Sequence, residues 1–165
     1  MEIRSEQTED IAIIGQITKA AFAPKEYSSQ TEAAIVDALR DAGALTVSLV
    51  AVIEGEVVGH VAFSPVTIDG EHRRWYGLGP VSVRPDRQKE GIGGKLIREG
   101  LARLTKADAE GCVVLGDPGY YKRFGFENDP GLRFEEAPAE YFMRLAFDEP
   151  APSGRVAYHD GFNAT

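Results

Sequence analysis

The 165-residue sequence has a single cysteine and no long apolar segment. One cysteine excludes an internal disulfide and a cysteine metal cluster. Cys112 lies in the apolar run CVVL, which predicts a buried thiol rather than a nucleophile. No apolar run approaches the roughly 20 residues of a membrane-spanning helix. The first residues, Met1–Arg4, contain no signal-peptide core, and we therefore expect a cytoplasmic protein.

Basic residues are in the minority, since 18 lysines and arginines stand against 26 aspartates and glutamates, and the formal net charge is −8. This balance disfavours nucleic acids and anionic membranes as partners. The charge is uneven, because residues 84–98 are basic on balance and residues 127–149 are strongly acidic. A basic segment in an acidic protein suits a small anionic ligand, although scattered surface charge produces the same pattern.

The rest of the composition is that of an ordinary globular protein, with 43% hydrophobic and 27% charged residues. The length fits one domain with a real core, so we expect a single domain over residues 1–165. No internal repeat, low-complexity tract or linker is visible.

Apolar patterning predicts helices and strands that form a mixed sheet, in an α/β or α+β fold. Helices are expected at Thr8–Ala21, Glu32–Ala42, Lys95–Ala109 and, for about one turn, Tyr120–Phe124. Strands are expected at Glu2–Ser5, Thr46–Ile53, Val57–Ile68, Arg73–Val83, Cys112–Leu115 and Tyr141–Phe147, with a further one starting at Phe126. The polar residues Asp148–Thr165, which include proline and glycine, are expected to form an extended tail.

Glycine and proline mark two irregular points in these strands. Asp69-Gly70 is a strong hairpin-turn sequence. Gly79-Pro80 falls inside the strand Arg73–Val83, where glycine permits a bulge and proline removes a hydrogen-bond donor. We therefore expect that strand to depart from a regular ladder.

The segment Arg84–Gly94, RPDRQKEGIGG, lies between an apolar strand and a helical pattern. Strand, glycine-rich turn and helix form an anion-binding arrangement, because glycines let a ligand approach the backbone. The start of the helix supplies unpaired N–H groups and the positive end of the helix dipole. The segment therefore predicts a pyrophosphate site.

The glycine spacing excludes two nucleotide-binding patterns. The dinucleotide fingerprint would need a glycine where Leu96 stands, and the triphosphate loop would need one where Lys89 stands. The spacing that remains is Q-x-x-G-x-G, formed by Gln88, Gly91 and Gly93.

With Y-x-x-x-G-F further on, at Tyr121, Gly125 and Phe126, this spacing resembles the GNAT superfamily of acyl-CoA-dependent N-acetyltransferases. The resemblance runs through most of the chain and is closer still to a YhbS-like branch. It is carried by the segments LGPVSV (78–83), GDPGYYKRFGF (116–126), GHVAFSPV (59–66) and YFM (141–143).

The resemblance implies a GNAT-like fold, in which helices flank a central mixed, mostly antiparallel sheet and two strands splay apart at the cofactor cleft. It implies transfer of the acetyl group of acetyl-CoA to a primary amine, by direct attack in a ternary complex and without a metal. The acceptor would be a small molecule or a protein amine. The cofactor-binding residues that it implies are Val81, Ser82, Val83, Gln88, Lys89, Glu90, Gly91, Ile92, Gly93, Gly94, Asp117, Tyr121 and Phe124.

Acyl transfer to an amine makes three chemical demands. The amine must lose a proton, since a free alkyl amine has a pKa of about 10.4. The oxyanion of the intermediate needs an N–H donor, and the resemblance implies the amide of Val81. The leaving thiolate gains from a proton donor, and Tyr121 is the predicted general acid.

The general base is left open among Glu26, His60, His72 and Asp117. Each also has an ordinary structural interpretation: respectively a solvated loop charge, a satisfied strand histidine, an exposed hairpin residue and a turn cap. Trp75 and Tyr76 would line the acceptor pocket or pack in the core.

Two other functions are compatible with the sequence. One is a non-catalytic acyl-CoA-binding module that acts as a sensor or scaffold. The other is a nucleotide-binding protein whose glycine turn does not bind coenzyme A. A monomer and a homodimer are both open.

Overall fold

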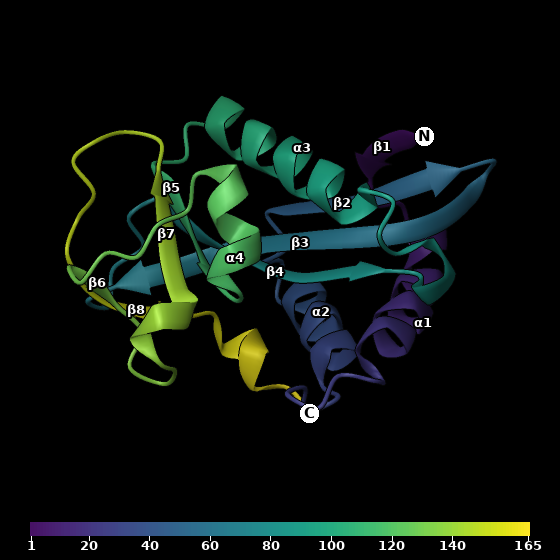
Figure 1. Ribbon diagram of the computed structural model, residues 1–165, viewed down its shortest axis with the longest axis horizontal. Helices are drawn as coiled ribbons and strands as arrows, with labels where there is room; N and C mark the ends of the chain where they lie inside the picture. The colour runs from purple at the N-terminus through teal and green to yellow at the C-terminus, as the bar shows by residue number, and fades with distance from the viewer.

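The computed structural model describes all 165 residues, which form one extended sheet with helices on both faces (Figure 1). The helices are α1 (Ile11–Phe22), α2 (Glu32–Asp41), α3 (Ile92–Lys106) and α4 (Pro118–Tyr121). The strands are β1 (Glu2–Ser5), β2 (Val47–Ile53), β3 (Glu56–Ile68), β4 (Trp75–Val83), β5 (Gly111–Leu115), β6 (Leu132–Arg133), β7 (Phe142–Ala146) and β8 (Gly154–Tyr158). Short 3₁₀ helices are η1 (Thr8–Asp10), η2 (Pro85–Arg87), η3 (Lys122–Phe124), η4 (Ala139–Tyr141) and η5 (Asp160–Asn163).

The sheet has the order β1-β2-β3-β4-β5-β7, and only β4 and β5 run parallel along this path. Strand β8 pairs antiparallel with the end of β3 and parallel with β6. The mixed, mostly antiparallel sheet that the sequence predicts is therefore confirmed. No helix combines the length and hydropathy that crossing a membrane requires.

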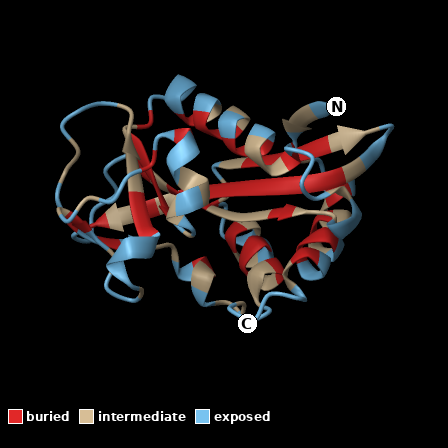
Figure 2. Ribbon diagram, viewed as in Figure 1, coloured by how far each residue is buried: buried red, intermediate tan, exposed pale blue.

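Helix α3 covers one face of the sheet, whereas α1 and α2 cover the other. The long strand β3 is buried along most of its length, as Figure 2 shows. Its side chains alternate between the two faces: Gly59 and Phe63 lie against α3, and His60 and Ser64 point to the opposite side. A Cβ at Gly100 of α3 would overlap the Phe63 ring, so this glycine permits the close packing of helix on sheet.

The predicted irregularity in β4 is confirmed. Gly79 has φ of +133°, a backbone conformation that residues other than glycine rarely adopt. The register with β3 shifts between Val61 and Phe63. Strand β4 pairs with β5 only over Trp75–Leu78, and its remaining residues have no β5 partner. The two strands therefore separate beyond Leu78, as the resemblance implied.

Two predicted helix starts are wrong. Thr8–Asp10 forms the 3₁₀ turn η1 and not the beginning of α1, because Gln7 is the cap and Asp10 accepts the Gln7 amide at 2.7 Å. Helix α3 begins at Ile92 and not at Lys95, so two of the glycines predicted in the turn belong to its first helical turn. Gly91, with φ of +84°, is the residue that ends the turn.

The predictions for the C-terminal third also need correction. Phe126 does not start a strand; only a single bridge joins Glu127 to Arg144, and β6 comes later. The expected tail Asp148–Thr165 instead contains β8 and η5. The buried side chain of Val156, opposite Ile68 in β3, shows why this short segment is held in the sheet. Cys112 is fully buried, as predicted, and burial raises the pKa of its thiol.

Candidate active site

The turn before α3 presents backbone N–H groups without side chains over them. The first bond of the helix runs from the amide of Lys95 to the carbonyl of Gly91 at 3.1 Å. The amides of Ile92, Gly93 and Gly94 therefore have no partner within the helix, and no side chain caps them. Anions are stabilised at such a terminus by these donors and by the helix dipole.

Helix α4 lies beside the uncapped N-terminus of α3. A Cβ at Gly93 would lie 3.6 Å from Val83 and 3.7 Å from the hydroxyl of Tyr120. A Cβ at Gly94 would lie 3.8 Å from the ring of Phe124. The fold thus brings the glycine turn together with the Y-x-x-x-G-F segment, which is about 30 residues further along the chain.

One edge of β4 is open next to the same turn. The amide of Arg84 donates to Val58 of β3 at 2.8 Å, and strand alternation therefore directs the amides of Val81 and Val83 away from β3. Strand β5 has no pairing at this level. The carbonyl of Val83 accepts a hydrogen bond from the side chain of Gln88 at 3.0 Å, so Gln88 joins the turn to the strand edge.

Tyr121 lies on α4 at the opening between β4 and β5. Its ring packs against Gly116, where a Cβ would lie 2.5 Å away, and edge-on to Tyr120 at 5.1 Å between ring centroids. Burial, with smaller effects from neighbouring groups such as Tyr120, raises the pKa of Tyr121 above its usual value. The phenol therefore carries its proton throughout the neutral pH range.

Two other predicted cofactor residues have clear structural contacts. Asp117 caps α4 by accepting the amide of Gly119 at 2.9 Å, as its turn-cap interpretation predicted. Phe124 is buried, with the guanidinium of Arg98 4.8 Å from its ring centroid. Asp117 thus holds the start of α4, and Phe124 lies beside Gly94 at the start of α3.

Of the other residues considered as general base or as lining of the acceptor pocket, some are exposed and some are buried. Glu26 is exposed in the loop between α1 and α2. His72 is exposed in the β3–β4 hairpin, with its Nδ1 3.1 Å from the carbonyl of Val66 and its ring edge-on to Tyr76. Trp75 is fully buried, which supports core packing over a pocket-lining position.

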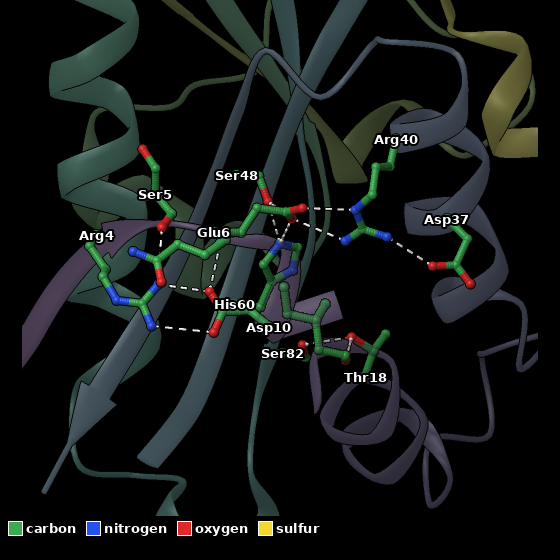
Figure 3. A network of polar contacts seen from close by, with 12 residues as sticks. Arg4, Ser5, Glu6, Asp10, Thr18, Asp37, Arg40, Ser48, His60 and Ser82 are labelled. Atoms are coloured by element: carbon green, nitrogen blue, oxygen red, sulfur yellow. Dashed lines mark hydrogen bonds and ion pairs between the residues drawn. The ribbon is translucent and has the colours of Figure 1, made fainter. Parts of the chain in front are cut away.

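His60, the fourth base candidate, belongs to a polar network that links β2 and β3 to α2 through Glu6, the residue after β1 (Figure 3). Ser48 lies between His60 and Glu6, with His60 Nε2 2.8 Å from the Ser48 hydroxyl and that hydroxyl bonded to the Glu6 carboxylate. Arg40 donates to both carboxylate oxygens of Glu6, at 2.8 and 3.0 Å. Polar residues within apolar strands were the one sequence signal for this network, and sequence reasoning did not identify Glu6, Arg40 or Ser48.

The network fixes the protonation of the histidine. Because the Ser48 hydroxyl donates to Glu6, its oxygen accepts from His60 Nε2–H, and Nδ1 is left unprotonated. His60 Nδ1 is buried and has no hydrogen-bond partner. Burial lowers the pKa of His60, so its ring is neutral at pH values where an exposed histidine is partly charged.

Two parallel strands that pair only at one end, beside the uncapped start of a helix, are the arrangement that the resemblance to acyl-CoA-dependent N-acetyltransferases implies. The sequence agrees, because residues 2–128 match the family described as an acetyltransferase (GNAT) domain. The chain belongs to the GNAT acetyltransferase family, and the resemblance predicted from its motifs is confirmed.

Particular relatives are close over nearly the whole chain. The uncharacterized N-acetyltransferase YhbS of Escherichia coli K12 is 37% identical over 150 residues, which are 87% of this chain and 90% of YhbS. The structure of YhbS from Escherichia coli in complex with CoA matches with a TM-score of 0.90 and 34% identity, over 98% of this chain and 91% of that one. A GNAT family acetyltransferase from Brucella melitensis, in complex with acetyl-CoA, is 59% identical with a TM-score of 0.88, over 98% and 97% of the two chains.

Proposed function

We propose that this acetyltransferase binds acetyl-CoA along the open edge of β4 and transfers its acetyl group to a primary amine in a ternary complex. The observation that carries the proposal is that residues Val81–Val83 of β4 have no β5 partner and lie beside the uncapped N-terminus of α3. Relatives with 34% and 59% identity are described in complex with CoA and acetyl-CoA. Residues 1–165 would act as one acetyltransferase domain.

The cofactor contacts follow from the two backbone surfaces. The pantetheine arm carries amides, and it would pair with the outward-facing backbone of Val81 and Val83 as an additional strand. The pyrophosphate would lie over the amides of the segment 88–94, where the helix dipole favours negative charge. Ser82, Asp117 and Phe124 complete the proposed cofactor surface from β4 and α4.

The reaction would proceed by direct attack of the neutral amine on the thioester carbonyl. The amide of Val81 would donate to the oxyanion of the tetrahedral intermediate. The attacking nitrogen would lose one proton to solvent as the C–S bond breaks. Tyr121 would give the leaving sulfur a hydrogen bond and its proton, and would regain a proton from solvent. Its raised pKa keeps the phenol protonated at neutral pH, so Tyr121 would meet the developing thiolate as a hydrogen-bond donor and not as a base.

The acceptor would be an amine of a small molecule or of a protein. Its entry side would be the face of the sheet opposite α3, because α3 and the cofactor-binding turn occupy the other side. The acceptor amine must be neutral when it attacks, since a protonated amine has no lone pair. It would therefore either arrive neutral or lose its proton in the site.

Isothermal titration with acetyl-CoA, and with NAD⁺ as a dinucleotide control, tests the binding part. We expect saturable binding of acetyl-CoA and none of NAD⁺; the reverse result would remove both the transferase and the acyl-CoA sensor functions. Release of free CoA thiol is then followed with a panel of small primary amines and amine-bearing peptides. Binding of acetyl-CoA without thiol release from any acceptor would favour the non-catalytic sensor over the enzyme.

A further inference from the structure

Buried polar atoms without a partner gather on one side of the sheet. Of the five such side-chain atoms, four belong to His60, Ser64, Trp75 and Tyr158, on the face opposite α3. An unpartnered buried donor or acceptor is costly, and native proteins keep one where a water or a ligand completes the bond. Two of the four atoms, in Ser64 and Tyr158, are hydroxyls near the β4–β5 opening.

The ring of Tyr158 crosses from the C-terminal strand onto β4. Strand β8 places Tyr158 opposite Val66 of β3. The ring nevertheless reaches Gly77 of β4, where a Cβ would lie 2.6 Å from its Cε1 atom. Gly77 pairs with Val113 of β5, so the ring extends toward the place where β4 and β5 separate. Only a glycine at position 77 leaves room for this crossing.

Other aromatic rings fix the position of Tyr158. Phe134 packs edge-on to it with ring centroids 5.1 Å apart, and Phe162 of η5 lies at 5.0 Å. Its hydroxyl is buried and has no hydrogen-bond partner. Burial, with smaller effects from Cys112 and Tyr121, raises the pKa of Tyr158, so the phenol is neutral and both donates and accepts hydrogen bonds.

Ser64 supplies the second hydroxyl. It lies directly opposite Gly77 in the β3–β4 register, and its side chain is on the face that the Tyr158 ring covers. Ser64 is completely buried, and its hydroxyl also has no partner. The hydroxyl-bearing residues of β3 and β8 therefore lie on the same face of the sheet around Gly77, with both hydroxyls shielded from bulk water.

We propose that the hydroxyls of Tyr158 and Ser64 form a subsite that binds the amine nitrogen of the acceptor, an inference that rests on the proposed transferase function. A primary amine that attacks with its lone pair has two N–H groups left, and each would donate to one hydroxyl. The pair orients the lone pair toward the thioester and removes no proton. This geometry favours primary over secondary amines, because a secondary amine leaves one hydroxyl unpaired.

Tyr158→Phe tests the subsite, because it removes the hydroxyl and retains the ring on Gly77. We expect KM for the best primary amine of the panel to rise about tenfold, the loss of one hydrogen bond, while the Kd of acetyl-CoA and the unfolding temperature stay unchanged. The preference for that amine over its N-methyl derivative should shrink by a similar factor. If the Tyr158 hydroxyl had only a structural role, the variant would keep both the KM for the amine and the preference for the primary amine.

Ser64→Ala should likewise raise the KM for the amine and leave the Kd of acetyl-CoA unchanged. In the double variant, the loss of amine binding free energy should be smaller than the sum of the two single losses. Tyr141→Phe is the matched control, because it removes an exposed tyrosine hydroxyl, and its kinetics should equal those of the original chain. Unchanged KM and selectivity in both Tyr158→Phe and Ser64→Ala would overturn the subsite.

A crystal structure of the CoA complex soaked with propylamine decides the question independently of turnover. The propylamine nitrogen should lie within hydrogen-bond distance of both hydroxyls. An amine bound elsewhere, or hydroxyls that have only water beside them, would overturn the subsite. If the original chain acetylates no amine, the proposed function fails, and this structure still shows whether the hydroxyl pair binds an amine.

Discussion

Tyr120 and Tyr121 are neighbours in sequence with different surroundings. Tyr120 places its hydroxyl close to Gly93 and Gly94 at the start of α3, and Arg123 stacks on its ring at 4.5 Å. For Tyr121, burial is the main cause of a raised pKa. Tyr120 therefore lies beside the start of α3, and in the proposed mechanism Tyr121 is the phenol that would meet the developing thiolate.

Tyr121→Phe should lower kcat by about 100-fold, the ordinary contribution of a general acid, and leave the Kd of acetyl-CoA unchanged. The ring packing against Gly116 and Tyr120 is retained, so the variant should fold normally. Steady-state thiol release and titration calorimetry measure the two quantities. A variant with the rate of the original chain would exclude Tyr121 from proton transfer.

Helix α3 is the element that joins the hydrophobic core to the cofactor turn. Its apolar side, with Leu96 and Leu104 fully buried, packs on β3, and its first turn has unpaired amides at the surface. In the proposed function, the buried side of α3 therefore supplies stability and its first turn supplies the cofactor contacts.

Gly93→Val should weaken acetyl-CoA binding by more than tenfold, which is about 1.4 kcal/mol, without unfolding the protein. A Cβ at Gly93 meets its neighbours at ordinary contact distances, so the branched side chain would extend over the amides that the pyrophosphate needs. Gly15→Val is the matched control, since Gly15 is in a helix and a Cβ there would have no neighbour within 4 Å. Equal acetyl-CoA affinity in the two variants would contradict the proposed pyrophosphate site at the start of α3.

At the scale of the whole molecule, the network around Glu6 ties the N-terminus to α2 and the sheet. Burial disfavours the ionised carboxylate of Glu6, but the hydrogen bonds from Arg40 and Ser48, with His60 3.7 Å away, outweigh burial and hold its pKa well below the usual value. The pKa of His60 is also lowered, in its case by burial. Both groups therefore bind protons less readily in the folded chain than in the unfolded one.

The free energy of unfolding should consequently fall as the pH is lowered from about 7 to about 4. The loss should begin below about 6.5, where the unfolded chain protonates His60, and steepen below about 4.5, where it protonates Glu6. Urea unfolding over a pH series measures it. Glu6→Gln should be less stable near neutral pH and show a smaller acid-dependent loss, whereas Glu140→Gln, an exposed control, should retain the original slope. Parallel pH curves for all three proteins would contradict this account.

Much of the central sheet could be predicted from local sequence. The strands β2, β3 and β5 coincide with apolar runs to within one residue, because a strand buried on both faces has few polar positions. The bulge at Gly79-Pro80 was predictable because those two residues restrict the ladder in any context. Strand β8 was missed, since its five residues, GRVAY, are too short an apolar pattern to predict a strand without the pairing with β3.

The sequence by itself determined the family, the order of the core elements and the glycine turn, because spacing and apolar periodicity are local properties of the chain. Tertiary structure alone decided which distant side chains meet. It placed Tyr120 beside Gly93, connected Glu6 to His60 through Ser48, and carried the ring of Tyr158 over Gly77. Such contacts depend on strand register and on which face each residue occupies, and a one-residue change of register would reverse every side chain in a strand.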